Sequence, residues 1–421
     1  MAIKKAAETK IAIIGLGYVG LPLLVEFSKY YSSIGFDVND KRVNELQSGF
    51  DRTNEIQSKK KLKSLLCTTD VNDIKECNIF IITVPTPVKL NNAPDLSPIK
   101  KASEAIGKLI KKDDIIIYES TVYPGMTEEV CVPLLEKYSG MAYKKDFHCG
   151  YSPERINPSD NVHTLTKIQK IISASSPETL SLLKSLYGSI IHAGVYEAES
   201  IKVAEAAKVI ENAQRDINIA FVNELALIFK QLNINTSSVL KAASTKWNFL
   251  PFSPGLVGGH CIGVDPYYLA HKAKKEGYSP KILLAGRELN DSMSSFIAND
   301  LIHALAEKNI IPAQAKILIM GVTFKENCPD TRNSKAFDLI KFFQLKKIHV
   351  DAFDPQADIE HIKEEHNFDM LSKISKSKLL QYQGIIFTVA HNEFKDINLK
   401  LSSKRVIYDI KSFLKLSDVS L

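Results

Sequence analysis

A cysteine in a glycine-rich loop is the first candidate for covalent chemistry in this chain. Cys261 lies in the segment "PGLVGGHCIGVDPYYL", residues 254–269, after Gly258 and Gly259 and four residues before Asp265. Glycines let a backbone approach a ligand closely. Four residues make about one helical turn, so Asp265 can share a face with the thiol. Because cysteine attacks a carbonyl even when little of it is ionised, the loop favours a nucleophilic thiol.

Two other interpretations of this loop stay open. A lone cysteine is most often a small buried side chain without chemistry. A metal site would use His260 and Cys261, but adjacent residues rarely aim at one ion, and no second pair is spaced to complete the site. We therefore predict no metal.

A polar stripe on a long helix is the second candidate. Residues 200–231 contain no Gly or Pro, which predicts one helix roughly 48 Å long at ~1.5 Å per residue. Lys208, Asn212 and Arg215 recur at i, i+4 and i+7 on it. A lysine can stabilise an oxyanion, an asparagine can bind a sugar hydroxyl, and an arginine can bind a phosphate or carboxylate.

The opposite side of this helix is apolar, and a solvated polar face is the plain alternative for the stripe. We expect the apolar side to pack on a core or on a second subunit, which leaves the polar side facing something else. The apolar residues are Val203, Ile210, Ala213, Ile217, Phe221 and Ile228.

A third candidate is the stretch "IAIIGLGYVGLPLLVEF", residues 11–27, which spaces three glycines as G-x-G-x-x-G between a strand and a helix. Gly15 permits the turn, Gly17 lets a pyrophosphate approach the backbone, and Gly20 lets helix and strand pack closely. Asp37 ends the next strand, where an acidic side chain accepts from the adenosine ribose and repels a 2'-phosphate, and Arg42 could stack on the adenine. The motif predicts NAD rather than NADP; a tight turn without a ligand is the alternative.

The elements that must position these residues alternate between strand and helix. Apolar runs of strand length are separated by segments with helical spacing, which predicts a doubly wound parallel sheet. The same alternation restarts at residue 316 after a helical connector. We predict an α/β chain with two Rossmann-like domains, residues 1–198 for NAD and residues 313–421, joined by a helical domain at 199–312 through which the chain would dimerise. The expected strands lie at 10–15, 33–37, 78–84, 114–120, 316–321, 348–354 and 384–390.

Composition excludes several other classes. The chain has 421 residues, 45% hydrophobic and 24% charged, and its net charge of +6 is spread out rather than gathered into a nucleic-acid footprint. No apolar run is long enough for a membrane span, and no signal segment is visible. Six scattered cysteines without a C-x-x-C pair favour reduced thiols. We expect a cytoplasmic protein.

Taken together, these motifs resemble the UDP-glucose/GDP-mannose dehydrogenase family over nearly the whole chain. The sequences "SPERINP" and the Cys261 loop look most like those of one branch of the family. That branch oxidises UDP-N-acetylhexosamines, UDP-GlcNAc or UDP-GalNAc, for capsule, Vi-type and O-antigen polysaccharides. The other matching segments are "TVPTPV" (83–88), "YESTVYPG" (118–125), "GYSPERINP" (150–158) and "GVTFKENCPDTRNS" (321–334).

The resemblance implies a four-electron oxidation of C6 with two NAD per sugar. Cys261 would form a thiohemiacetal and then a thioester, which water hydrolyses. The implied catalytic residues are Cys261, Lys208, Asp265, Asn212, Glu154 and Thr121. The implied cofactor contacts are Gly15, Gly17, Tyr18, Val19, Gly20, Asp37, Arg42, Thr86, Thr121 and Arg332. The implied substrate contacts are Arg155, Ile156, Lys208, Asn212, Arg215, Gly258 and Lys325, and a homodimer or larger homo-oligomer is expected.

The chain departs from the family at one position. In the UDP-glucose and GDP-mannose branches a second carboxylate follows the equivalent of Glu154 by four residues, and here that position is Pro158. The second Rossmann-like domain also lacks its own G-x-G-x-x-G, so its phosphate contacts must come from side chains such as Lys325 and Arg332.

Four alternatives remain from the sequence. The substrate could be UDP-glucose or UDP-N-acetylmannosamine. The reaction could be a two-electron alcohol oxidation with Cys261 as a structural residue. A nucleotide sensor without activity is the non-enzymatic alternative.

Overall fold

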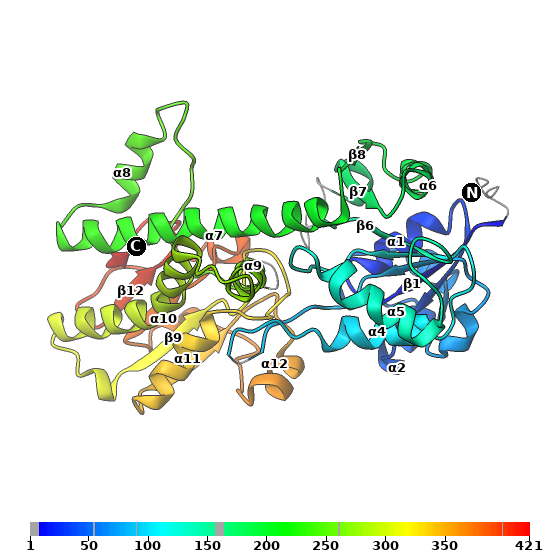
Figure 1. Ribbon diagram of the computed structural model, residues 1–421. Helices are drawn as coiled ribbons and strands as arrows, with labels where there is room; N and C mark the ends of the chain where they lie inside the picture. The colour runs from blue at the N-terminus through cyan, green and yellow to red at the C-terminus, as the bar shows by residue number, and fades with distance from the viewer. Residues whose placement is uncertain (1–7, 54, 90, 156–163, 260–261, 398) are drawn as a thin grey trace. The chain divides into compact units, whose positions relative to one another are not determined.

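The computed structural model describes residues 8–53, 55–89, 91–155, 164–259, 262–397 and 399–421. The chain forms two compact units (Figure 1). The first contains the chain up to Glu211 together with Tyr267–Glu276, and the second contains Asn212–Pro266 and Gly277–Leu421. The three-domain division at 198 and 312 stays a prediction.

A sheet of eight strands forms the centre of the first unit. Its order, β3-β2-β1-β4-β5-β6-β7-β8, runs outward from β1 in both directions, as in a dinucleotide-binding fold. Every pairing is parallel except that of β6 with β7. The strands are β1 Lys10–Ile14, β2 Ser32–Phe36, β3 Leu66–Thr68, β4 Ile79–Ile82, β5 Ile115–Tyr118, β6 His148–Tyr151, β7 Lys170–Ala174 and β8 Val195–Glu197.

Apolar runs explain the central strands of this sheet. All four residues of β4 and of β5 are buried, as expected for parallel strands covered on both faces. The covering helices are α1 Gly20–Phe27, α2 Asp40–Ser48, α3 Lys59–Lys63, α4 Ser97–Gly107, α5 Val132–Ser139 and α6 Pro177–Gly188. Because β1 and β4 are neighbours from which the chain leaves in opposite directions, a crevice is expected beyond their carboxyl ends.

The long helix α7 spans Ile201–Gln231, as predicted. The apolar stripe, for which a core or a second subunit is the expected partner, is mostly uncovered within this chain. Val203, Ile210, Phe221 and Ile228 of the apolar stripe are exposed. The buried side is rich in polar residues, which are Glu205, Lys208, Asn212, Asp216 and Asn223. The four exposed side chains are therefore not part of the chain's own core, whereas Ala213 of the same stripe is buried.

The second unit contains a parallel sheet of five strands in the order β10-β9-β11-β12-β13. These strands are β9 Lys316–Met320, β10 His349–Phe353, β11 Gly384–Phe387, β12 Val406–Asp409 and β13 Val419–Ser420. The remaining helices are α8 Thr236–Ala243, α9 Asp265–Lys275, α10 Lys281–Glu307, α11 Ala336–Leu345, α12 Ile359–His366 and α13 Lys376–Leu379. The expected α/β class with two Rossmann-like sheets and one long helix is confirmed.

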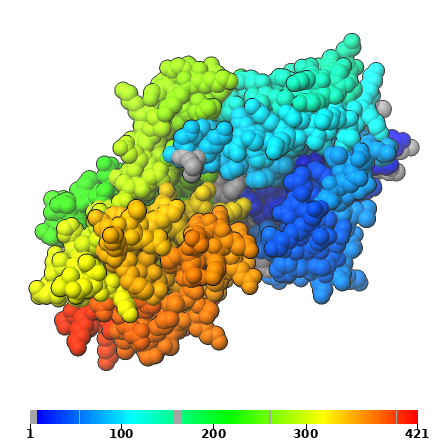
Figure 2. Space-filling model, turned by 90° about the horizontal axis from the view of Figure 1, so that it is seen from below, coloured from blue at the N-terminus to red at the C-terminus, as the bar shows by residue number. Residues whose placement is uncertain are grey.

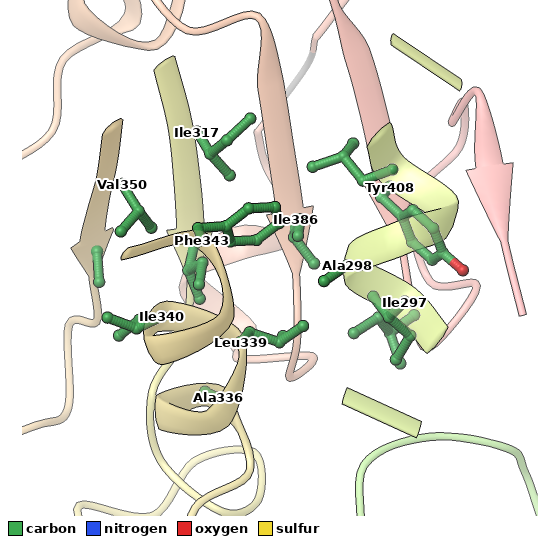
Figure 3. Packing of buried hydrophobic residues seen from close by; sticks show 14 of the residues in the cluster. Ile297, Ala298, Ile317, Ala336, Leu339, Ile340, Phe343, Val350, Ile386 and Tyr408 are labelled. Atoms are coloured by element: carbon green, nitrogen blue, oxygen red, sulfur yellow. The ribbon is translucent and has the colours of Figure 1, made fainter. Parts of the chain in front are cut away.

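Aliphatic and aromatic side chains fill the space between this sheet and its helices. Figure 3 shows Leu339, Ile340 and Phe343 of α11 against the strand residues Ile317 and Ile386. On the same face, Ile297 and Ala298 of α10 lie beside Tyr408 of β12. Ile362 of α12 belongs to the same buried cluster, and Figure 2 shows the yellow and orange atoms of this part of the chain on the face seen from below. The core fixes the strand ends from which the site loops start.

Within the described residues, the helices are all too short or too polar to cross a bilayer.

Candidate active site

The glycine turn after β1 has a separate reason for each of its three glycines. Gly15 has a φ of +97°, which favours glycine. A Cβ on Gly20 would lie 1.9 Å from the Gly15 carbonyl oxygen, so helix α1 meets the turn too closely for any side chain. A Cβ on Gly17 would have no heavy atom within 4 Å. The turn is therefore closed at Gly15 and Gly20 and open at Gly17, where the pyrophosphate is expected.

This contrast predicts opposite outcomes for two alanine substitutions. Gly20→Ala should destabilise the protein by about 1–3 kcal/mol or more, because neither backbone can move away from the new methyl group. Gly17→Ala should leave the melting temperature nearly unchanged and raise KM for NAD, because its methyl group enters the open space. Thermal unfolding and NAD titration of both variants check this. Equal destabilisation of both would contradict the assignment.

Asp37 and Arg42 both hold Leu16, the residue between the first two glycines. The Leu16 N–H donates to Asp37 Oδ2 at 2.8 Å, and the Leu16 carbonyl accepts from Arg42 Nε at 2.8 Å. Arg42 is buried and pairs with Asp51 at 2.9 Å. Burial alone would raise the Asp51 pKa, but hydrogen bonds from Thr53 and Ile56 and the Arg42 charge lower it overall. Arg42 thus stabilises the glycine turn through its hydrogen bond to Leu16. The expected stacking of Arg42 on adenine stays a prediction.

Four more of the expected cofactor residues lie at the carboxyl edge of the same sheet, whereas Arg332 belongs to the second unit. Val19 is the N-cap of α1, and Tyr18 precedes it. Thr86 is buried in the loop after β4, and Thr121 is half-buried in the loop after β5. Glu205 of α7 holds the loop that carries Thr121, because its carboxylate accepts from the amides of Gly125 and Thr127. Burial raises the pKa of Glu205 to about 7.

Glu154 and Arg155 follow β6 and are held by different partners. Glu154 Oε2 lies 2.7 Å from the buried ammonium of Lys170. The Arg155 guanidinium donates to the α7 carbonyls of Ala207 and Lys208 at 2.8 and 3.1 Å, and it pairs with Glu211 at 2.8 Å. Arg155 therefore ties the loop after β6 to the helix that carries Lys208. Its expected contact with substrate is untested, and Ile156 and Pro158 lie outside the described residues.

Asn212 and Asp265 are brought together in the second unit. Asn212 Nδ2 donates to Asp265 Oδ2 at 2.6 Å, and both side chains are buried. Helix α9 begins at Asp265 itself, so the spacing to Cys261 is not a turn of that helix. Cys261 and His260 lie outside the described residues. Arg215, the third member of the polar stripe, is exposed.

A pocket of about 80 Å³ at the carboxyl edge of the second sheet contains two expected substrate residues, Gly258 and Lys325. Two further lysines, Lys335 and Lys411, line it as well. Desolvation lowers the pKa of the half-buried Lys411 ammonium, and Glu326 only partly offsets this. Three ammonium groups and the carboxylate of Glu326 line the pocket, and this excess of positive charge suits an anionic ligand. Arg332 lies outside this lining and pairs with Asp330 in its own loop.

The glycines of the Cys261 loop serve packing as well as ligand approach. A Cβ on Gly258 would lie 2.5 Å from the Asn333 carbonyl oxygen, and a Cβ on Gly259 would lie 2.7 Å from the Phe324 ring. Farther back, the Asn223 amide of α7 bonds both the N–H and the carbonyl of Gly255, at 2.7 and 3.0 Å. The start of this loop is fixed on α7 and packs against the segment 324–335.

The turn after the first strand of the second sheet has the same hydrogen bonds as the glycine turn after β1. Gly321 follows β9 with a φ of +98°, and Thr388 donates to its carbonyl oxygen as Thr83 does to that of Gly15. Asp354 accepts from the Val322 N–H at 2.7 Å, in the place of Asp37. Asp354 is buried against His391, however, so it is not available to a ribose. The turn at Gly321 therefore has the shape of the turn at Gly15, but its acidic residue cannot accept a hydrogen bond from a ribose.

Comparison with known proteins gives the family of the chain. Three models of the UDP-glucose/GDP-mannose dehydrogenase family match consecutive parts: its NAD binding domain over residues 9–191, its central domain over 202–292 and its UDP binding domain over 318–416. This chain belongs to the UDP-glucose/GDP-mannose dehydrogenase family. It is therefore an NAD-dependent oxidoreductase, as the resemblance implied, and the glycine turn after β1 lies within the part that matches the NAD binding domain.

Individual members of the family match over nearly their full length. The chain is 52% identical to UDP-N-acetyl-D-glucosamine 6-dehydrogenase of Pseudomonas aeruginosa, with 97% of each chain covered. It is 53% identical to the enzyme of the same name from Salmonella typhi, with 98% of this chain and 99% of the relative covered. A solved UDP-D-ManNAc dehydrogenase from Pyrococcus horikoshii superposes with a TM-score of 0.86 at 30% identity, covering 97% and 96% of the two chains.

Residues that the sequence reasoning missed lie mainly next to those it found. Lys170 contacts Glu154 and is itself paired with Glu119. Glu205 holds the Thr121 loop, and Lys411 lines the pocket of the UDP binding domain. The sequence contains a signal that could have pointed to Lys170 and Glu119. Lys170 begins an apolar strand and Glu119 directly follows another, and charged side chains at such buried positions need partners. Among the described residues, no group of three or more His, Cys, Asp or Glu is placed to hold a metal.

Proposed function

We propose that this dehydrogenase removes four electrons from C6 of a UDP-N-acetylhexosamine, UDP-GlcNAc or UDP-GalNAc. The product would be the UDP-N-acetylhexosaminuronic acid, for surface polysaccharide synthesis. The sugar is inferred from the names of the relatives at 52% and 53% identity. The chemistry rests on one geometric observation above all, the buried Asn212–Asp265 hydrogen bond four residues beyond Cys261.

The chain's own residues divide the work as follows. NAD, when bound, accepts a hydride from C6 in each of the two oxidations. After the first oxidation the Cys261 sulfur bonds to the C6 aldehyde carbon, and the Lys208 ammonium stabilises the oxygen that becomes negative. After the second oxidation C6 is a thioester. Glu154, with Asp265 and Thr121 holding the water, takes a proton from that water as its oxygen bonds to C6. The C–S bond then breaks, and the leaving thiolate takes the proton back from Glu154, which restores the thiol and the carboxylate.

The nucleotide half of the substrate would rest in the pocket of the UDP binding domain. Lys325, Lys335 and Lys411 supply positive charge there, and Gly258 leaves its backbone accessible. Burial alone would lower the Lys335 pKa, but the carboxylates of Asp291 and Asp338 raise it, so this lysine stays charged. Because the mechanism needs a free thiol, we place the enzyme in a reducing compartment, the cytoplasm.

An NADH assay with UDP-GlcNAc, UDP-GalNAc, UDP-ManNAc and UDP-glucose tests the proposal. Two NADH per molecule of UDP-GlcNAc or UDP-GalNAc, with much lower kcat/KM for the other two sugars, is the expected result. One NADH per sugar would instead indicate a simple alcohol dehydrogenase. Preference for UDP-ManNAc or UDP-glucose would overturn the substrate assignment, and no turnover with any sugar would favour a sensor.

Asp37 predicts the cofactor preference. Its half-buried carboxylate accepts from the backbone N–H groups of Leu16 and Asn39, which fixes a negative charge beside the turn. A 2'-phosphate would meet this charge directly, so kcat/KM with NADP should be lower than with NAD by about two orders of magnitude or more. Steady-state kinetics with both cofactors check this, and comparable values would remove the argument.

The exposed apolar stripe of α7 predicts a homodimer or a larger homo-oligomer. Val203, Ile210, Phe221 and Ile228 are 46%, 54%, 55% and 45% exposed, and such a stripe is stabilised when a second copy covers it. Ile210→Glu and Phe221→Glu should shift the mass measured by light scattering toward the monomer. Lys101→Glu on the exposed side of α4 serves as the control. A wild-type monomer at working concentration would refute this prediction.

A further inference from the structure

A buried group of charges lies beneath Glu154, at the carboxyl edge of the first sheet. Lys170 Nζ lies 2.8 Å from Glu119 Oε2 and 2.7 Å from Glu154 Oε2. It also donates to the Pro153 carbonyl. Tyr187 of α6 donates its hydroxyl hydrogen to the other oxygen of Glu119. Each of these charged side chains is more than nine-tenths buried, so the ion pairs are shielded from solvent.

The antiparallel pairing of β6 with β7 creates this arrangement. Tyr151 pairs with Ser173. Glu154 lies three residues beyond Tyr151, past the end of β6, and Lys170 lies three residues before Ser173 in β7, so continuing the antiparallel register brings the two positions opposite each other. A parallel strand at this place would bring the opposite end of β7 to the edge. The reversal therefore delivers a lysine to the side of the sheet where the reaction occurs.

The three buried groups, Lys170, Glu119 and Glu154, do not sum to a neutral cluster. With all three groups ionised, the cluster has one ammonium and two carboxylates, a net charge of −1. Burial raises the Glu119 pKa, although Lys170 opposes this, while the two carboxylates raise the Lys170 pKa against the effect of burial. If Glu154 takes a proton, a neutral Lys170–Glu119 ion pair remains. A lysine without Glu119 would attract the Glu154 carboxylate strongly and weaken it as a base.

We propose that Lys170 is a positioning residue for Glu154, and that Glu119 neutralises Lys170 so that Glu154 stays basic enough to take a proton from water. This inference rests on the proposed function, because it concerns the hydrolysis of the thioester. Lys170 fixes one oxygen of the carboxylate. Glu119, itself held by Tyr187, compensates the charge of the ammonium. Among the described residues, Arg155 is also charged and is adjacent to Glu154 in the chain, and its guanidinium is paired with Glu211.

The charge balance predicts shifts of opposite sign in the pH dependence of hydrolysis. Glu119→Gln leaves the ammonium uncompensated, so the acidic limb should move down by about one pH unit and the plateau rate should fall about tenfold. Lys170→Met leaves two adjacent carboxylates, so the limb should move up by a similar amount. Lys170→Arg keeps the cation and should stay near wild type. In the double variant Lys170→Met/Glu119→Gln, Glu154 faces two neutral side chains, and the limb should return toward its wild-type position.

The step can be measured directly by mixing excess full-length enzyme with limiting UDP-GlcNAc and NAD at each pH. Intact-mass analysis of quenched samples follows the loss of the covalent adduct on Cys261. Opposite shifts in the two single variants, reversed in the double variant, support the proposal. Lys170→Met is the variant most prone to misfold, and the Glu119→Gln and double variants then still decide the question. Slower hydrolysis with unmoved limbs in both would show a merely structural role and overturn the proposal. A wild-type enzyme that never forms the adduct would instead refute the proposed function.

Discussion

Replacing Cys261 with serine should lower steady-state turnover by several orders of magnitude, while the fold and substrate binding stay nearly intact. The side chain changes by one atom, but a serine hydroxyl is a much poorer nucleophile near neutral pH. Losing one member of a catalytic unit commonly costs about that much. Any product should be free aldehyde, or an ester on the introduced serine that hydrolyses very slowly. NADH production and intact mass after incubation with substrate report both outcomes.

Cys77→Ser is the matched control for this experiment. Cys77 is buried just before β4, at the amino edge of the first sheet, and the carboxyl edge carries the glycine turn. The same one-atom change there should leave turnover within a few-fold of wild type. A Cys261→Ser enzyme that still forms two NADH per sugar at near-normal speed would show that the thiol is structural.

Changing Asp265 to asparagine should lower kcat by about 100-fold or more with little change in KM. Asp265 is buried and bonds Asn212 at 2.6 Å, so its carboxylate has a fixed orientation. Asparagine has the same size, and rotation of the Asn212 amide would keep a hydrogen bond between the two side chains. The lost function is acceptance of a hydrogen bond from the attacking water by a charged oxygen.

Asp114→Asn provides the comparison for this substitution. Asp114 is also buried, but it lies before β5 and accepts from the Lys111 amide at 2.7 Å. Its loss should lower thermal stability and leave kcat near wild type. If Asp265→Asn behaves in the same way, with lower stability and normal kcat, then Asp265 has no part in the chemistry.

The strand and helix pattern was largely visible in the sequence, because long apolar runs and helical spacing are local signals. Which side of α7 is buried was not visible in the sequence. The sequence shows an apolar stripe and a polar stripe, but it does not show which one the rest of the chain covers. In the structure the polar side is buried, since Asn223 bonds Gly255, Asn212 bonds Asp265 and Glu205 bonds the loop before α5. These partners are far away in sequence.

The candidate site was predictable where a motif marks it and obscure where a tertiary contact creates it. The glycine turn and the order of motifs indicated the NAD domain and the family. Lys170 became visible only through the register of β6 and β7, and Lys411 only through its place at the end of β12. The bracing role of Arg42 depends on Asp51, which no motif connects to it.

The glycine turn of the first unit and the lysine-lined pocket of the second unit attract phosphate in different ways. Ligand binding at the two sites should therefore depend differently on ionic strength. The first offers backbone amides at the start of a helix, whose partial charges act over one turn. The second has kept its Gly321 turn but surrounds the pocket with the ammonium groups of Lys325, Lys335 and Lys411. Full charges at a solvent-open pocket are screened by salt within about 10 Å at 0.1 M. A cell that concentrates its salts would therefore weaken the hold on the sugar-nucleotide more than the hold on NAD, although salt also screens the helix end.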